Sequence, residues 1–186
     1  MRLSFIAVTS DQQFRDLLIV RNECRDGLTH DKHEITLGEQ TAWKAQCWPG
    51  DRYYNEGPLN QGWMHKTSWY EPYLLYNDQT PVGYGLLKWD SEKYWMTVGV
   101  ARDFRRKGLG KLITNLITEI GHRGNKEVWL DVMDDNPMLP TYIKSGYEFQ
   151  ETTYGEQDLH VMKHNQNQNF RPKELFWFQN HQKLQS

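Results

Sequence analysis

The chain has 186 residues, of which 38% are hydrophobic and 13% aromatic, so it can bury a core and does not have a disordered composition. Its formal net charge of -2 argues against a protein that coats nucleic acid, because such domains usually carry a strong basic excess. We therefore expect one domain over residues 1–165 and a C-terminal tail over residues 166–186.

The cysteines and the apolar runs favour a cytoplasmic protein. No stretch approaches the roughly 18 apolar residues that span a membrane. The apolar run at the N-terminus is short and broken by Ser and Asp, unlike a signal peptide. Cys24 and Cys47 are too few for a disulfide framework, which favours a reducing compartment and buried or inert thiols. We expect no membrane association, and either a monomer or a homodimer.

The first part of the chain predicts a strand followed by a helix. Residues 2–8 favour the strand. Ser10 and Gln13 make a capping-box signal for a helix that ends at about Asn22. The expected apolar face of this helix consists of Phe14, Leu17 and Leu18.

A second capping-box signal, Thr36 with Glu39, predicts a helix over residues 37–47. Trp43 and Cys47 share one face of this segment because they are four residues apart. The hydrophobic periodicity is otherwise weak, so the boundaries of this helix rest mainly on the capping signal.

Residues 49–67 are rich in Gly, Pro, Asn and Gln and predict a long loop. Tyr53, Tyr54 and Trp63 are scattered through it. These rings either pin the loop to the domain or stack on a flat or sugar-like acceptor, and the sequence does not favour one interpretation over the other.

An antiparallel meander follows the loop. Turn signals at residues 77–79 and 90–92 separate its strands. The expected strands are residues 69–77, 80–89 and 93–101.

The clearest helix of the chain comes next. Its apolar residues recur at i, i+3, i+4, i+7, i+8 and i+11, as on one face of an amphipathic helix. They are Leu109, Leu112, Ile113, Leu116, Ile117 and Ile120. Gly121 or Gly124 can end this helix.

Residues 127–133 alternate apolar and polar side chains and predict a strand. A helical crossover precedes this strand, so it must run parallel to the strand at 93–101. Asn136 and Pro137 predict the start of a short helix that ends before Gly146. The buried side of that helix would carry Leu139, Tyr142 and Ile143.

A final hairpin is predicted from residues 147–154 and 158–164. The complete set of elements predicts an α+β fold, with a mixed, mostly antiparallel central sheet of about seven strands flanked by helices. In the tail, the apolar cluster at residues 175–178 favours docking on the same domain over a partner interface, because exposure of such a cluster is costly.

Residues 104–111, FRRKGLGK, place basic residues and two glycines where the clearest helix begins. Backbone N–H groups at a helix start and the positive end of the helix dipole favour an anion. Gly108 and Gly110 allow phosphate oxygens to approach the amides closely, and the neighbouring cations can add charge-assisted hydrogen bonds. The segment therefore predicts a diphosphate site, although a solvated basic face is the alternative.

The motif Arg105-x-x-Gly108-x-Gly110 after an apolar strand resembles the acyl-CoA pyrophosphate signature of the GNAT superfamily of N-acyltransferases. The periodic helix, the strand at 127–133 and the residues from Asn136 to Gly146 follow in the order and spacing of that family, over about residues 70–150. Arg102 stands where many members have proline. The first 50 residues are more distantly similar to members that acetylate amino-sugar nucleotides.

This resemblance implies a V-shaped splay between the fourth and fifth strands, where acetyl-CoA binds as cosubstrate. The pantetheine arm would pair with the backbone at Val98 and Val100, and Asn136 would also contact the cofactor. Tyr142 matches the catalytic tyrosine of the family, which would hydrogen-bond or protonate the departing thiolate. The remaining expected cofactor-binding residues form the motif itself: Arg105, Arg106, Lys107, Gly108, Leu109, Gly110 and Lys111.

Acetylation of an amine requires a neutral nitrogen, so a base should lie near the acceptor. The sequence does not choose among its candidate bases, which are Glu34, Glu56, His65, Asp90, Glu92 and Asp131. His30 and His33 are close together, but no carboxylate or thiol pattern completes a metal site, and we expect none.

The sequence favours an N-acetyltransferase that transfers an acetyl group directly to a small amine in a ternary complex, since neither cysteine lies in the motif. The acceptor would be an amino sugar, a polyamine or an amino acid derivative. The alternatives are an acyltransferase that modifies a macromolecule, either a protein amine or a nucleobase, and a non-catalytic module that senses acyl-CoA. The net charge counts against a nucleic-acid partner.

Overall fold

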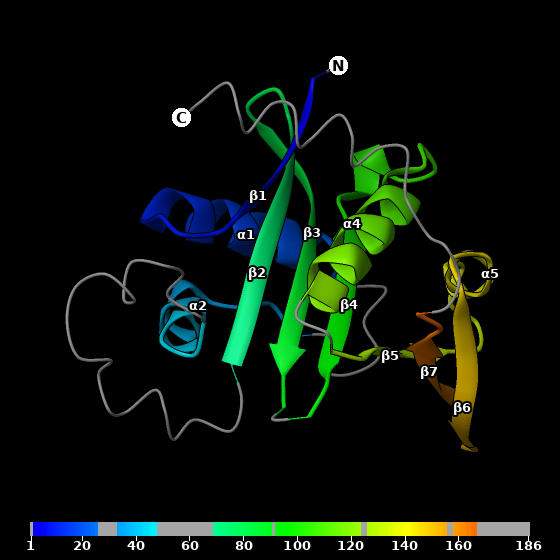
Figure 1. The fold of residues 1–186 in the computed structure, drawn as a ribbon. Helices are drawn as coiled ribbons and strands as arrows, with labels where there is room; N and C mark the ends of the chain where they lie inside the picture. The colour runs from blue at the N-terminus through cyan, green and yellow to red at the C-terminus, as the bar shows by residue number, and fades with distance from the viewer. Residues whose placement is uncertain are drawn as a thin grey trace.

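The computed structural model describes residues 2–25, 33–47, 69–90, 92–123, 126–155 and 158–166. Its strands form one seven-stranded sheet in the order β1-β2-β3-β4-β5-β7-β6 (Figure 1). The strands are β1 (Leu3–Ala7), β2 (Trp69–Asn77), β3 (Thr80–Trp89), β4 (Tyr94–Val100), β5 (Val128–Met133), β6 (Tyr147–Thr153) and β7 (Leu159–His164). The helices are α1 (Asp11–Glu23), α2 (Leu37–Lys44), the 3-10 turn η3 (Arg102–Phe104), α4 (Leu109–Arg123) and α5 (Leu139–Lys144).

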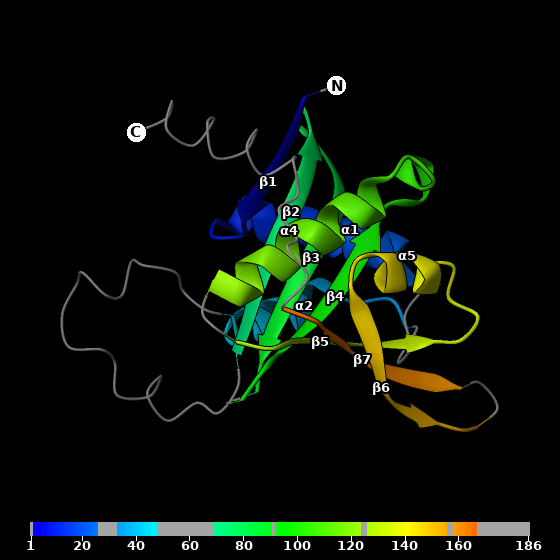
Figure 2. The same cartoon turned by 45° about the vertical axis from the view of Figure 1, so that its right-hand side comes forward.

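The pairing of β4 with β5 is the one parallel step among these strands, and it is short. It joins Tyr94 to Val128 and Trp95 to Trp129. Beyond Trp95, β4 continues to Val100 while β5 turns away to pair with β7, and Figure 2 shows the two strands diverging. The predicted mixed sheet and its splay between the fourth and fifth strands are confirmed.

Helices cover the sheet on two sides. α4 packs across β3 and β4 on one face, while α1 and α2 lie on the opposite face (Figures 1 and 2). The core under α4 includes Ile113, Ile117 and the β5 residues Val128, Leu130 and Val132. This amphipathic packing follows from the apolar stripe of α4, which the sequence predicted.

Both predicted capping boxes are present. The Ser10 hydroxyl accepts a hydrogen bond from the amide of Gln13, and the Gln13 side-chain oxygen in turn accepts one from the Ser10 amide. Thr36 and Glu39 form the same reciprocal pair at the start of α2. Each box satisfies amides that have no partner inside the helix. α2 is shorter than predicted and ends at Lys44.

Three predicted packing details are wrong. Val20 rather than Leu18 completes the buried face of α1, and Leu18 is only half-buried. Ile143 is 48% exposed, because the turn of α5 that buries Tyr142 directs its neighbour outward. Met138, and not Asn136, is the N-cap of α5; the Asn136 side chain instead accepts a hydrogen bond from the Met138 amide at 2.9 Å.

Other predictions lie wholly or largely outside the described residues. They concern the loop at 49–67, its rings Tyr53, Tyr54 and Trp63, the tail at 166–186 and Gly124. Within the described part of the chain, Gly121 lies inside α4 and does not end it. No helix of that part is long and apolar enough to cross a membrane.

Gly99 on β4 provides a test of the packing between β4 and α1. A Cβ atom there would lie 2.2 Å from Tyr84 Cε1 and 2.9 Å from Cys24 Sγ, and both neighbours are buried. We predict that Gly99→Ala lowers the free energy of unfolding by about 1–3 kcal/mol, through overpacking. Urea denaturation measures this loss.

Gly38→Ala is the matched control, because the nearest atom to a Cβ at Gly38 lies 3.9 Å away. Gly38 is in α2, where alanine favours the helix by about 0.5–1 kcal/mol, so this variant should be as stable as the natural protein or more so. A Gly99→Ala protein with an unchanged unfolding midpoint would contradict the packing described here.

Candidate functional site

The segment between β4 and α4 has an open, strained backbone. Arg106 and Gly108 adopt positive φ angles of 60° and 79°. Non-glycine residues rarely adopt such angles, so the conformation at Arg106 must be held by its surroundings. A Cβ atom at Gly108 would meet nothing within 4 Å. The outer side of this turn is therefore accessible to a ligand.

The backbone amides of this turn point to an anion. Within the described part of the chain, no hydrogen bond engages the amides of Arg106, Lys107, Gly108, Leu109 or Gly110. They stand at the start of α4, where the helix dipole adds positive potential. The Leu109 side chain is buried in the core and fixes the first turn of the helix. These unengaged amides are the donors that the predicted diphosphate site requires.

Arg105 holds the turn from inside. Its Nε donates to the carbonyl of Val100 at 3.0 Å, and its Nη2 donates to the carbonyl of Glu23 at 3.1 Å. The guanidinium therefore ties the turn to the end of β4 and to the end of α1. This arrangement differs from a guanidinium that extends into solvent to meet a phosphate.

The other cations of the turn are more exposed. Lys107 donates to the carbonyl of Asp103 at 2.9 Å and lies over the ring of Phe104, 5.0 Å from its centroid. Arg106 and Lys111 are exposed. Their charges can add to the potential at the amides, with less screening than between charges in bulk water.

β4 offers an unpaired edge next to this turn. The Tyr94 amide donates toward the β5 side, to Glu127, whereas the Ala101 amide donates to Val82 of β3. Successive residues of a strand point their backbone groups to opposite sides, so Val98 and Val100 present theirs to the splay. The Val100 carbonyl is used by Arg105. The backbone groups of Val98 are thus available to a ligand that adds itself as a strand.

Tyr142 lies in the same region. Its residue is 7% exposed, and its ring packs edge-on against Tyr147 with centroids 6.0 Å apart. Among described side chains, the buried oxygens without a hydrogen-bond partner belong to Asn77 and Thr114. The Tyr142 hydroxyl also makes no hydrogen bond there, so it must reach accessible space.

The pKa of Tyr142 is raised, first by burial and then by the negative charge of Asp131. The phenol therefore stays protonated across the neutral range and can donate a hydrogen bond. Met138, the N-cap of α5, approaches residues 105–110, which we call the phosphate turn after the prediction: a Cβ atom at Gly110 would lie 3.0 Å from the Met138 side chain. The structure thus brings the start of α5, at Met138, to the first turn of α4.

The candidate bases separate into groups. Burial raises the pKa of Asp90, but hydrogen bonds from Trp95 and two backbone amides outweigh it and leave that pKa below its ordinary value, as expected for a turn residue. Glu34 and Glu92 are exposed. Asp131 is half-buried on β5, and its charge acts on Tyr142. Glu56 and His65 lie outside the described residues.

No cluster of three or more His, Cys, Asp or Glu residues suited to a metal occurs in the described ranges. His33 is exposed and lies 3.0 Å from Glu39, whereas His30 lies outside those ranges. Cys24 and Cys47 are both buried, as predicted.

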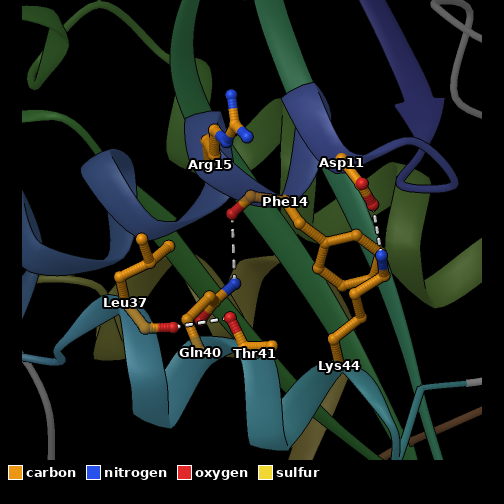
Figure 3. A pocket seen from close by; sticks show the side chains of 7 residues that line it. All are labelled: Asp11, Phe14, Arg15, Leu37, Gln40, Thr41 and Lys44. Atoms are coloured by element: carbon orange, nitrogen blue, oxygen red, sulfur yellow. Dashed lines mark hydrogen bonds and ion pairs between the residues drawn. The ribbon is translucent and has the colours of Figure 1, made fainter.

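An open pocket between α1 and α2 is separate from the phosphate turn (Figure 3). The ion pair between Lys44 and Asp11 spans one side of it, and Gln40 donates to the Phe14 carbonyl at 3.2 Å. These polar groups satisfy one another. None of the predicted site residues lines this pocket, so we do not assign it to the site.

Sequence reasoning did not find a pair formed by the half-buried His122, near the end of α4, and the buried His164. His122 Nε2 lies 2.8 Å from His164 Nδ1, and His164 Nε2 lies 3.0 Å from the Ser145 carbonyl. With both rings neutral, His164 donates to Ser145 and His122 donates to His164, so His122 Nδ1 has no proton for the Lys126 carbonyl 2.9 Å away and accepts from Gln166 at 2.9 Å. The two residues are 42 positions apart, and no local pattern joins them.

Comparison with known proteins identifies the family and the fold. Residues 38–147, more than half of the chain, match the acetyltransferase (GNAT) family. A search of curated protein sequences found no significant match.

Solved structures match most of the chain. An N-acetyltransferase from Staphylococcus aureus Mu50 has a TM-score of 0.64 and 13% identity, covering 88% of this chain and 98% of that one. The Salmonella typhimurium protein yncA, solved with its cofactor acetyl-CoA, has a TM-score of 0.66 and 12% identity, covering 93% and 99%. A mutant of the spermidine N-acetyltransferase SpeG from Vibrio cholerae has a TM-score of 0.62 and 13% identity, covering 87% and 92%. At these identities they establish the fold.

The histidine pair generates a pH prediction. Burial, and then the charge of His122, lower the pKa of His164 to about 4 from its ordinary value of 6.5. The unfolded chain therefore takes up a proton first as the pH falls. The stabilisation is complete above pH 6.5 and is lost toward pH 4. We predict that the free energy of unfolding falls by about 2 kcal/mol between pH 7 and pH 5.

Denaturant titrations at each pH measure this effect. His164→Gln should flatten the pH dependence, because it removes the titrating ring. His160→Gln is the control, since His160 is half-buried and bonded to Thr152 on the neighbouring strand. Equal pH dependence in the natural protein and the His164→Gln variant would rule out the pair as its source.

Proposed function

The chain belongs to the acetyltransferase (GNAT) family, and on that premise we propose that it moves an acetyl group from acetyl-CoA to a primary amine of a small molecule, such as an amino sugar, a polyamine or an amino acid derivative. The transfer is direct and takes place in a ternary complex. The catalytic domain spans residues 1–165, and the protein acts in the cytoplasm, in keeping with its two cysteines, which are both buried.

One observation carries the proposal. The unengaged amides of Arg106–Gly110 lie at the start of α4, directly after a strand whose edge toward β5 is unpaired beyond Trp95. The first feature suits a diphosphate, and the second suits an extended arm that ends in a thioester. Coenzyme A combines these two parts in one molecule, so the residues present fit it.

The chain would hold this cosubstrate as follows. The amides of Arg106–Gly110 bind the pyrophosphate, with Arg106, Lys107 and Lys111 adding charge. Val98 and Val100 line the edge along which the pantetheine arm lies, and the Asn136 turn closes the site beside them. Arg105 positions the turn through Val100 and Glu23. Bound acetyl-CoA supplies the acetyl group and a thiolate as leaving group.

Tyr142 and Asp131 complete the chemistry. The buried, protonated phenol of Tyr142 donates a hydrogen bond to the sulfur as negative charge develops on it. The acceptor must lose a proton to become nucleophilic, and Asp131 is the described candidate base whose charge reaches Tyr142. Asp131 takes that proton directly or through a water. Two of the similar structures support acetyl-CoA as donor and a small amine as acceptor, because yncA was solved with its cofactor acetyl-CoA and SpeG is a spermidine N-acetyltransferase.

A thiol-release assay with acetyl-CoA and a panel of primary amines tests the proposed function. We expect thiol release that depends on an amine, and initial-rate plots that intersect, as in a ternary complex. Ping-pong kinetics would contradict direct transfer. If calorimetry detects no coenzyme A binding by the folded protein, the cofactor assignment is wrong.

Tyr142→Phe separates catalysis from binding. The ring and its packing remain, but the hydrogen bond to the leaving thiolate is lost, so we predict that kcat falls by about 100-fold. The dissociation constant of coenzyme A should stay within about twofold of the natural value, as measured by calorimetry. Full activity in this variant would exclude Tyr142 as the donor.

Gly108→Ala tests the phosphate turn. The new methyl group would occupy the open outer side of the turn and disfavour the positive φ of 79° by about 1–2 kcal/mol. We predict that coenzyme A binds at least about tenfold more weakly, since the turn must change shape where the phosphates approach. Pantetheine, the part of coenzyme A that lacks the diphosphate, should bind equally to both proteins. Unchanged coenzyme A affinity would place the pyrophosphate elsewhere.

A further inference from the structure

Two tryptophans, Trp95 and Trp129, lie where β4 and β5 begin to diverge, and we call them the vertex pair. Trp95 and Trp129 are partners in the last parallel pair that joins β4 to β5. Their ring centroids lie 6.1 Å apart, and both residues are half-buried. Because Val128 and Leu130 pack under α4, the intervening Trp129 faces the opposite side of the sheet. The pair therefore lines the splay from the side away from α4.

This aromatic pair already holds an ammonium group. The Nζ atom of Lys93 lies 4.9 Å from the centroid of Trp95 and 4.1 Å from that of Trp129. Such distances are those of cation–π attraction, which tryptophan supplies better than other rings. A second ammonium, that of Lys163, lies 5.6 Å from Trp129. The site is thus suited to alkyl ammonium groups.

Carboxylates surround the pair. Trp95 Nε1 donates to Asp90 at 2.6 Å, and Trp129 Nε1 donates to Glu127 at 2.9 Å. Asp131 lies two residues beyond Trp129 on the same face of β5. A third ammonium belongs to Lys88, the cross-strand neighbour of Trp95, so these three carboxylates and three ammonium groups balance. When Lys93 moves away, the local net charge becomes -1, which favours a replacement cation.

We propose that Trp95 and Trp129 select the acceptor: they bind the distal ammonium of a linear diamine or polyamine, which displaces Lys93, while the primary amine at the other end reaches the thioester. This inference rests on the proposed function and specifies its substrate class. Lys93 occupies the position in the absence of an acceptor, as an ammonium supplied by the chain itself.

The geometry of β4 explains why two nitrogens are required. Val98, which lines the proposed path of the pantetheine arm, is three residues beyond Trp95, or about 10 Å along the strand. An extended alkyl chain can place one nitrogen at the tryptophans and the other at the acyl carbon. In the transfer, the C–N bond forms as the C–S bond breaks, the amine proton passes to a base such as Asp131, and the sulfur leaves as a thiolate.

The first experiment compares diamines with monoamines of equal chain length. Putrescine, cadaverine and 1,6-diaminohexane are assayed beside butylamine, pentylamine and hexylamine in the thiol-release assay. We expect at least one diamine to exceed its monoamine in kcat/KM by about 3- to 30-fold. Turnover of amines without this preference would overturn the inference and leave the acetyltransferase assignment standing.

Variants then test the residues. Trp129→Leu keeps an apolar side chain but removes the π face, so the preference for the diamine over its monoamine, measured as the ratio of their kcat/KM values, should fall by about 3- to 30-fold. Trp129→Phe should recover part of the loss. Coenzyme A affinity in each variant reports on the integrity of the fold.

Lys93→Met gives the sharper test, because it removes a competitor from the site. We expect KM for the diamine to fall several-fold. The matched control is Lys126→Met, since the Lys126 ammonium lies 4.8 Å from the centroid of Trp89, in a similar contact that does not involve the vertex pair. The control should leave KM unchanged. If Lys93→Met only lowers stability, the tryptophans merely hold the β3–β4 turn against β5, and the inference is wrong.

Binding can be measured without turnover. Calorimetric titration of putrescine, cadaverine and 1,6-diaminohexane into the protein saturated with coenzyme A should show binding of at least one diamine that weakens in Trp129→Leu and tightens in Lys93→Met. Absence of binding by any of the three, or equal affinity in all these proteins, would overturn the inference. Coenzyme A binding in the same samples tests the proposed function separately.

Discussion

The early end of the parallel pairing between β4 and β5 is the constraint on which the site depends. Two residue pairs hold the strands together, and beyond them β5 remains paired only with β7, along its other edge. A strand edge in the middle of a sheet leaves backbone groups that neither strand satisfies. Those groups need water or a ligand. The splay is therefore a binding edge that the topology itself creates, and α4, which follows β4, places its positive end beside it.

Arg105 makes this arrangement rigid. Its guanidinium bonds to the carbonyls of Val100 and Glu23, so one side chain connects the edge strand, the phosphate turn and the end of α1. The positive φ of Arg106 costs conformational energy, and these contacts together with the buried Leu109 maintain it. The shape of the turn thus depends on an inward-facing cation, Arg105, while outward-facing cations such as Arg106 supply charge.

Local patterns in the sequence predicted the helices whose signals lie within a single element. The stripe from Leu109 to Ile120 and the capping pair Ser10–Gln13 are spaced along single elements, so both could be predicted. The sequence placed Ile143 and Leu18 on buried helix faces, which is wrong. An apolar side chain next to a buried position can face the core or the solvent, and only the packing partner decides which. The Trp95–Trp129 and His122–His164 pairs join separate elements, and only the register of the sheet brings them together.

The two faces of the splay explain why direct transfer suits this chain. The phosphate turn and Tyr142 belong to the side that carries α4 and α5, whereas Trp95, Trp129 and Asp131 face the other side. The acceptor amine can then reach the acyl carbon of the thioester from one face of the sheet while the coenzyme stays bound at the other face. A covalent acyl-enzyme would require a nucleophile between them, but Cys24 and Cys47 are buried in the core under α1 and α2. In the proposed transfer, the proton released by the amine and the charge gained by the sulfur would appear on different faces, so Asp131 and Tyr142 could act in the same step without neutralising each other.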